Sequence, residues 1–430
     1  MLSFILVFIM FILFFLNIPI AYALISSSLV YFGFINTNMP LDLLMQRFVK
    51  SAESFPLLAI PFFIMAGAVM NYSGISKRLM AMAEVLTGHL VGGLAQVNVL
   101  LSVLMGGISG SANADAAMQC KILVPEMVKR GYSPAFSAAI TAASSAVSPI
   151  IPPGIVLIIY SLLANVSVTR MFIAGYTPGI LMALAMMITV YIISKKRGYA
   201  PSRAKAPTMK EIFQQLMNSF WALILPFGII MGMRIGMFTP TEAGAIAVVF
   251  TIVIGFFIYK ELKLSHFPAI LRETVYGTST VMLIIIAANI LGYYMSWERI
   301  PHQLTQLLLE ITQDKFYLLM IINLLLLFLG MFIEGGAAMI IIAPLLIPTV
   351  KNLGIDLIQF GVVVIVNIMI GGITPPFGSM MFLTCSLVKV KIIDFIKEII
   401  PFVFSLLLVL LILTYFPVVS TFLPNLVFKG

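Results

Sequence analysis

The chain has 430 residues, of which 61% are hydrophobic and 10% charged, with 25 Lys and Arg against 16 Asp and Glu. A composition this apolar excludes an ordinary soluble globular protein. In a membrane protein the formal net charge of +9 reports the orientation of the loops rather than a nucleic-acid partner. The sequence therefore predicts an all-α polytopic protein of the phospholipid bilayer that binds no nucleic acid.

Several apolar segments are long enough to cross the hydrocarbon core, which takes about 17 to 25 residues. In chain order they lie at 1–16, 18–36, 55–72, 171–193, 219–238, 241–259, 276–296 and 398–423. Ala21-Tyr22-Ala23 is similar to a signal-peptide cleavage site, but the first basic residue is Arg47, so the basic region of a signal peptide is missing and a retained helix is expected. Cys120 and Cys385 lie in apolar segments and are predicted to be reduced packing residues.

Two proline-rich breaks interrupt apolar runs, at 148–154 and at 371–378. Pro152 and Pro375 are separated by 375 − 152 = 223 residues, and Pro153 and Pro376 by the same offset. This offset also pairs Gly107 with Gly330, Pro125 with Pro348, Gly131 with Gly354 and Ile150 with Ile373. Agreement of so many glycines and prolines at one offset predicts an internal repeat.

Each half is predicted to contain scaffold helices, an amphipathic arm, a glycine-interrupted hairpin, a broken helix and a closing helix. The first repeat, 1–193, divides into 1–72, 76–87, 89–128, 133–165 and 171–193 in that order. A basic cytoplasmic connector covers 194–218, and the second repeat, 219–430, divides into 219–296, 299–313, 316–350, 358–388 and 398–423. Small or polar residues at the middle of each hairpin favour a re-entrant turn inside the membrane over two full spans.

Basic residues give the orientation, because Lys and Arg concentrate in cytoplasmic loops. The richest loop contains Lys195, Lys196 and Arg197, and threading from it places Lys129 inside. The counterpart of Lys129 in the second half is the uncharged Asn352, which threads outside. The two halves are therefore predicted to form an inverted-topology repeat, although five basic residues thread outside as well: Arg47, Lys50, Arg170, Arg299 and Lys315.

The prolines of the first break carry a chemical consequence. Pro149, Pro152 and Pro153 remove backbone donors and leave carbonyl groups unpaired at membrane depth. Such backbone is tolerated where it is buried or lines a cavity. Unwound carbonyls suit Na⁺, and the N-termini of half-helices attract anions, so paired breaks predict the midplane site of a secondary transporter.

Several motifs give the chain a specific family resemblance. They are Gly92-Gly-Leu-Ala-Gln-Val-Asn98, Ile108-Ser-Gly-Ser-Ala112, Val124-Pro-Glu-Met-Val-Lys-Arg-Gly131, Pro152-Pro153, Gly330-Met-Phe332, Ala343-Pro344 and Thr374-Pro-Pro376. At these residues, and along nearly the whole chain, the sequence resembles the large membrane subunit (DctM-like) of tripartite ATP-independent periplasmic (TRAP) transporters.

The resemblance implies a Na⁺-driven importer of organic acid anions in the bacterial inner membrane. It implies an elevator motion of the hairpins and broken helices against a scaffold, a small four-helix membrane subunit and a periplasmic binding protein as partners. Many relatives have Asp-Pro-Thr at the second hairpin tip, where this chain has Glu334-Gly335-Gly336. A glycine-rich tip is similar to that of members that carry sialic acid or other sugar acids, with C4-dicarboxylates as the other substrate class.

Position within the two hairpins and breaks assigns the candidate site residues. The expected Na⁺ ligands are Ser109, Gly110, Ser148 and Ile151 in the first half and Gly330, Gly335, Gly371, Gly372, Thr374 and Phe377 in the second. The expected substrate contacts are Ser111, Asn113, Asp115, Ser145, Pro153, Glu334, Gly336 and Pro376. Alternatives remain, because small serines also permit close helix packing, Asn113 could only cap the turn, and Asp115 could couple Na⁺ or cap the second arm.

An intramembrane protease and a passive channel are the two alternatives to a transporter. Gly107-Ile-Ser-Gly110 matches the motif of rhomboid intramembrane serine proteases, but a nucleophilic Ser109 needs a base. His89, His266 and His302 are all predicted near an interface or in amphipathic segments. A passive anion channel would show one continuous polar stripe instead of two polar midplane tips. No Walker A or HExxH motif occurs, so an enzyme is not expected.

Overall fold

The structure is a computed structural model that describes residues 5–16, 18–35, 41–53, 55–312 and 314–428. Within these ranges the regular elements are helices only. The first half contains α1 (Ile5–Phe15), α2 (Ile20–Val30), η2 (Tyr31–Ile35), α3 (Leu41–Ala52), η3 (Phe55–Leu58), α4 (Ala59–Tyr72), α5 (Ile75–Thr87), α6 (Gly93–Ser109), α7 (Ala112–Ile122), α8 (Val124–Lys129), α9 (Pro134–Ser145), α10 (Ile155–Ala164) and α11 (Val168–Arg197). The second half contains α12 (Met209–Arg234), α13 (Pro240–Val253), η4 (Ile254–Ile258), η5 (Leu264–His266), α14 (Phe267–Trp297), α15 (Ile300–Ile311), α16 (Lys315–Phe332), α17 (Gly335–Asn352), α18 (Leu357–Gly371), α19 (Ser379–Val388), α20 (Ile392–Tyr415) and α21 (Pro417–Val427).

Helix length and composition confirm the predicted all-α polytopic membrane fold. In the described part of the chain, 7 helices are long and apolar enough to cross a membrane, and an eighth span results if α4 and α5 are counted together. These two helices meet at a bend of 72°. Helices α16 and α17 are both among these 7 membrane-length helices, and each could cross the membrane by itself. The re-entrant path of the second hairpin therefore stays a prediction.

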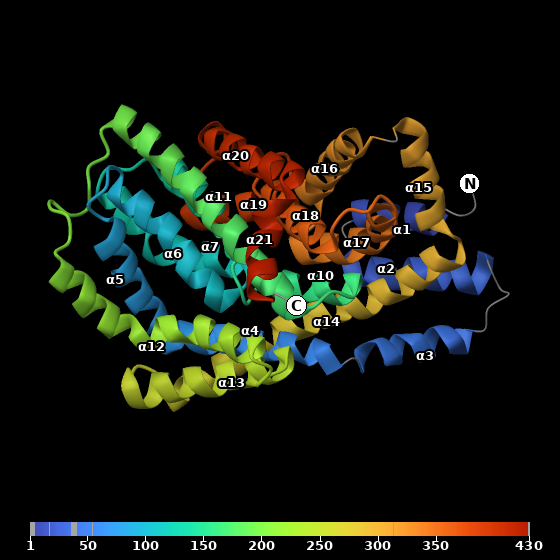
Figure 1. Ribbon diagram of the computed structural model, residues 1–430, viewed down its shortest axis with the longest axis horizontal. Coiled ribbons are helices and arrows are strands. Elements are labelled where there is room, and N and C mark those ends of the chain that lie inside the picture. Colours follow the sequence, from blue (N-terminus) through green and yellow to red (C-terminus); the bar gives the residue numbers. More distant parts are fainter. Residues whose placement is uncertain (1–4, 17, 36–40, 54, 313, 429–430) are drawn as a thin grey trace.

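The helices fall into two groups that Figure 1 separates. Helices α3, α4, α13 and α14 lie along the lower edge of the view, and α11, α16, α18 and α20 lie above them. Within the lower group α4 packs against both α13 and α14, and in the upper group α18 packs against α16 and α20. Helices α10 and α17 pack against each other, and α17 also reaches α14 of the lower group.

Helix boundaries recur at the offset that relates the two proline breaks. Helices α7 and α17 begin at Ala112 and Gly335, and 335 − 112 = 223; helices α9 and α18 begin at Pro134 and Leu357, and 357 − 134 = 223. The opposite orientation of the two halves across the membrane stays a prediction.

The proline breaks separate half-helices in both halves. Helix α9 ends at Ser145 and α10 begins at Ile155, and α18 ends at Gly371 while α19 begins at Ser379. The intervening residues form turns, because each proline lacks the N–H that a continuing helix needs.

The sequence prediction differs from the structure at several elements. In the described residues, the helices of the predicted spans 1–16 and 18–36, α1 and α2, are shorter than a full membrane crossing. The last closing helix was expected to run to 423, but α20 ends at Tyr415, since Phe416 precedes Pro417 and a residue before proline disfavours the helical conformation. Helix α3 was not predicted. It is amphipathic, with Asp42 in its first turn and Lys50 in its last, and it packs against α14.

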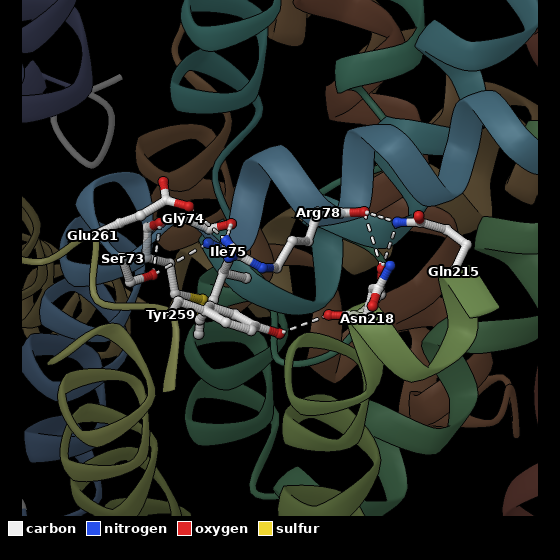
Figure 2. Close-up of polar contacts among 10 residues, drawn as sticks. Ser73, Gly74, Ile75, Arg78, Gln215, Asn218, Tyr259 and Glu261 are labelled. Atoms are coloured by element: carbon white, nitrogen blue, oxygen red, sulfur yellow. Dashed lines mark hydrogen bonds and ion pairs between the residues drawn. The ribbon is translucent and has the colours of Figure 1, made fainter. Parts of the chain in front are cut away.

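A polar network connects the start of the arm helix α5 to helix α12 and to the segment that follows η4 (Figure 2). The Arg78 guanidinium donates to Glu261 Oε1 at 2.8 Å and to the Gly74 carbonyl oxygen at 2.9 Å, and its Cζ lies 3.6 Å from the centroid of the Tyr259 ring. The Ser219 hydroxyl of α12 donates to the Arg78 carbonyl oxygen at 3.1 Å. Gly74 has φ of 80°, and a Cβ there would meet the Glu261 carboxyl carbon at 2.5 Å, so glycine is required at the bend.

We expect Arg78→Ala to lower the Tm of the detergent-solubilised protein by a few degrees. The substitution removes a partly exposed ion pair and a cation–π contact, together about 1 to 2 kcal/mol. Lys77→Ala is the matched control, because Lys77 is the adjacent residue on the same helix and makes no ion pair within the described chain. Equal Tm values for the two variants would contradict a role of the network in fixing the arm.

Candidate functional site

The two hairpin tips meet the two broken helices at one cavity of about 110 Å³. We call this cavity the tip pocket. Its described lining contains Gly110, Ser111, Ala112, Asn113, Pro149, Ile155, Val156, Ile159, Val281, Ile284, Glu334, Gly335, Gly336, Ala337, Ile340, Ile368, Met369, Gly372, Ser379 and Met380. Seven predicted site residues are therefore brought together here, from both halves of the chain: Gly110, Ser111, Asn113, Glu334, Gly335, Gly336 and Gly372.

Four helix N-termini converge on the tip pocket, because the first residues of α7, α10, α17 and α19 all belong to its lining. Each N-terminus carries unpaired N–H groups and a partial positive charge. Helices α10 and α19 begin after glycines, Gly154 and Gly378, which provide no side-chain cap. The backbone dipoles of these N-termini favour an anion in the pocket, although the Glu334 carboxylate also belongs to its lining.

Matched residues cap the other two N-termini. The Ser111 hydroxyl accepts a hydrogen bond from the Ala114 N–H at 3.4 Å, and Glu334 Oε2 accepts from the N–H groups of Gly336 and Ala337 at 3.1 and 3.3 Å. Ser111 and Glu334 are separated by the repeat offset, 334 − 111 = 223. The Glu334 carboxylate is thus engaged with backbone donors.

Glycines allow each hairpin to approach its break closely. A Cβ at Gly110 would lie 2.9 Å from the Pro153 carbonyl oxygen, and a Cβ at Gly106 would lie 3.0 Å from that of Ser148. In the second half, a Cβ at Gly371 would lie 2.6 Å from the backbone of Gly330. Carbonyl groups of the first break therefore lie beside hairpin backbone, and such oxygen atoms are the ligands that a hard cation such as Na⁺ requires.

Asp115 lies beside the tip pocket and does not line it. It is 1% exposed, and its Oδ2 accepts a hydrogen bond from the Ser148 hydroxyl at 2.8 Å. The Gln119 amide donates to both carboxylate oxygens at 3.1 Å and to the Ser102 hydroxyl at 2.6 Å. No basic side chain forms an ion pair with Asp115 within the residues that the structure describes. The cap of α7 is Ser111, so the alternative in which Asp115 caps this arm is wrong.

The other predicted ligands of the first half do not belong to the described lining of the tip pocket. The Ser145 hydroxyl donates to the Thr141 carbonyl oxygen of its own helix, which is the bonding expected of a packing serine. Ile151 and Pro153 are buried in the first break. Ser109 is the last residue of α6, and its side chain lies outside the described part of the structure.

The predicted ligands of the second half lie in different surroundings, some buried between helices and some exposed. Gly330 and Gly371 are buried at the contact between α16 and α18. The Thr374 hydroxyl donates to the Ile370 carbonyl oxygen at 2.6 Å. Pro376 and Phe377 are exposed and do not line the tip pocket, and the Phe377 ring lies 5.3 Å from that of Phe332.

The sequence analysis missed the apolar side of the pocket. Val281 and Ile284 of α14 form one wall, and Ile159 and Ile340 continue it from α10 and α17. Nothing in the sequence distinguishes these residues from the other apolar residues of the same helices. The polar groups of the site thus come from the hairpins and breaks, whereas the lower helix group contributes an apolar surface.

These features define a polytopic all-α permease with a small, partly polar cavity among broken helices. The chain belongs to the family of the DctM component of tripartite ATP-independent periplasmic transporters, which it matches over residues 7–419. It is therefore a multi-pass inner-membrane transport subunit and not an enzyme, which excludes the protease alternative.

Named relatives cover most of the chain. It is 37% identical over 415 residues to the sialic acid TRAP transporter permease protein SiaT of Haemophilus influenzae, covering 96% of this chain and 67% of that one. It is 36% identical over 414 residues to the sialic acid TRAP transporter large permease protein SiaM of Vibrio cholerae, covering 96% of each. It is 35% identical over 381 residues to the C4-dicarboxylate TRAP transporter large permease protein DctM of Pseudomonas aeruginosa, covering 88% of each.

A solved structure shares the fold. The YdaH transporter of Alcanivorax borkumensis superimposes with a TM-score of 0.61 at 15% sequence identity, covering 87% of both chains. At this identity the likeness concerns the fold alone.

Proposed function

We propose that this chain is the transport subunit of a Na⁺-coupled importer for an organic acid anion, either sialic acid or another sugar acid, or a C4-dicarboxylate. The observation that carries the proposal is the convergence of four helix N-termini on the tip pocket. A carboxylate there would accept hydrogen bonds from free backbone N–H groups and would be stabilised by the helix dipoles. The substrate classes follow the names of the relatives.

Sodium coupling is supported by the surroundings of Asp115. A carboxylate buried among neutral donors is costly unless a positive charge compensates it. The Ser148 hydroxyl, the Asp115 carboxylate and the break carbonyls would together supply oxygen ligands for Na⁺. In the second half, Thr374 and the carbonyls near Gly330 and Gly371 would do the same.

An elevator mechanism is supported by the division of the pocket lining. The polar lining comes from the hairpins and breaks, and the α14 wall contributes Val281 and Ile284. A site that presents an apolar wall can slide along it without breaking hydrogen bonds. The hairpins and breaks would therefore carry the anion across the membrane as one body, with the arm helices as its connections.

The proposed partners are a small four-helix membrane subunit and a periplasmic binding protein that delivers the anion. The test is uptake into proteoliposomes that contain this chain and the small subunit, with the cognate binding protein outside. Labelled sialate and a labelled C4-dicarboxylate would be compared with and without an inward Na⁺ gradient. We expect uptake of one acid that requires both Na⁺ and the binding protein; uptake that ignores both would instead favour the passive channel.

We expect Ser148→Ala to raise the Na⁺ concentration for half-maximal uptake about tenfold, the effect of removing one hydrogen bond to a charged group. Ser145→Ala is the matched control, since its hydroxyl is bonded within α9. The measurement is Na⁺-dependent uptake at saturating substrate, with Tm as the readout of folding. Equal Na⁺ dependence in the two variants would return Ser148 to a packing role.

A further inference from the structure

A second cavity of about 640 Å³ adjoins the tip pocket, between α3, α10, α14 and α17. Ile159 and Ile340 line both cavities, so the two cavities are neighbours at these side chains. The lining residues of α14 belong to its C-terminal half, the end that the distribution of basic residues predicts to be outside. We call this space the outer cavity. Its volume is in the range of small-molecule binding sites.

Arg47 of α3 is the one charged residue among the described residues that line the outer cavity. Its Cζ lies 4.0 Å from the centroid of the Tyr293 ring, a cation–π contact that orients the guanidinium plane. It forms no ion pair within the described chain. Stacking on an aromatic ring leaves the in-plane N–H groups free to bind a carboxylate in a bidentate manner.

Ser51, Asn289 and Ser296 near Arg47 each donate a hydrogen bond to a carbonyl oxygen of their own helix. The Ser51 hydroxyl donates to the Phe48 carbonyl oxygen at 2.8 Å, and the Ser296 hydroxyl donates to that of Gly292 at 2.9 Å. The Asn289 amide donates to the Ile285 carbonyl oxygen at 3.0 Å. The Arg47 guanidinium is therefore the one charged donor that the described lining of the outer cavity offers an anion.

We propose that Arg47 and the Tyr293 ring form an outer carboxylate-binding subsite on the path of the organic anion to the tip pocket. The inference rests on the proposed import function and adds a first binding position to it. A full positive charge captures the carboxylate at the outer cavity. The tip pocket then binds the same carboxylate through the partial positive charges of helix N-termini. The anion thus leaves the guanidinium of Arg47 and binds backbone N–H groups as it moves inward.

The first experiment measures the electrostatic effect of Arg47 without transport. A cysteine is introduced by Ser296→Cys at the wall of the outer cavity, and its reaction rates with an anionic and a cationic methanethiosulfonate are compared. Cys120 and Cys385 are buried, so the chain without the substitution is the blank. We expect Arg47→Gln to lower the ratio of anionic to cationic rates about tenfold, and Arg47→Lys to change it little. An unchanged ratio in Arg47→Gln would overturn the proposal.

The second experiment measures uptake by the reconstituted transporter. We expect Arg47→Gln to raise the KM for the organic anion about tenfold with little change in the maximal rate, and Arg47→Lys to recover part of the loss. A changed dependence on binding-protein concentration, with an unchanged KM for the anion and an unchanged rate ratio, would assign Arg47 to protein docking and overturn the subsite. If the wild-type chain imports no organic anion while the rate ratio still depends on Arg47, the proposed function fails and the anion-binding subsite stands.

Discussion

Asp115→Asn is expected to abolish Na⁺-driven uptake while leaving the protein folded. The carboxylate is 1% exposed and receives hydrogen bonds from Ser148 and Gln119, neither of which carries charge. If Na⁺ compensates this buried charge, removal of the charge costs about 3 kcal/mol of Na⁺ binding, or about a hundredfold in affinity. The measurement is uptake as a function of Na⁺ concentration.

Glu126→Gln is the matched control for this prediction. Glu126 is in α8, which directly follows α7, and pairs at the surface with Arg130 at 3.3 Å, so its neutralisation should leave Na⁺ dependence unchanged. Na⁺ dependence of Asp115→Asn equal to that of the wild type would show that the carboxylate is only a structural part of the hairpin. A loss of uptake accompanied by a large fall in Tm would lead to the same conclusion.

Gly371→Ala is expected to cost about 1 to 3 kcal/mol of stability and to impair uptake severely. The new Cβ would lie 2.6 Å from the Gly330 carbonyl carbon and 3.0 Å from the Met331 nitrogen. These are backbone atoms, so α16 must move away from the second break. That movement would displace the carbonyl groups proposed to hold the second Na⁺.

Gly228→Ala is the comparison variant, because the same glycine-to-alanine change is expected there to raise the stability of the protein. Gly228 lies within α12, and a Cβ there would meet no atom within 4 Å. Replacing an unhindered helix glycine by alanine should stabilise the protein by about 0.5 to 1 kcal/mol. Tm and uptake measured on both variants check the prediction, and a Gly371→Ala protein as stable and active as Gly228→Ala would contradict the close contact.

The hairpin tips and the breaks could be located from sequence because glycine and proline act locally. Pro152 and Pro375 lie in segments that leave the helical conformation, and their common offset revealed two equivalent segments. The convergence of Ser111 and Glu334 on one pocket required only that equivalent segments face each other. Membership of a transporter family follows from the same motifs, and the comparison with relatives confirms it.

Other features of the site could not be predicted from the sequence because they depend on tertiary packing. Val281 is one apolar residue in a long apolar helix, and only the structure shows that it lines the pocket. Asp115 is an ionisable residue in an apolar segment, but its bonds to Ser148 and Gln119 come from the way the hairpin packs on the break. Helix α3 was missed because its polar and apolar residues are mixed between two clearly apolar segments, and Arg47 was therefore treated only as a loop charge.

The helix N-termini around the tip pocket have an evolutionary consequence. If an organic anion binds there, as proposed, peptide groups would attract it, and no single side-chain replacement would remove that attraction because every residue keeps its peptide group. Side chains such as Asn113, Met369 and Met380 can then vary to fit a different molecule attached to the same carboxylate. Under this proposal, point mutations in a family with this architecture would change the substrate while binding of its carboxylate is kept.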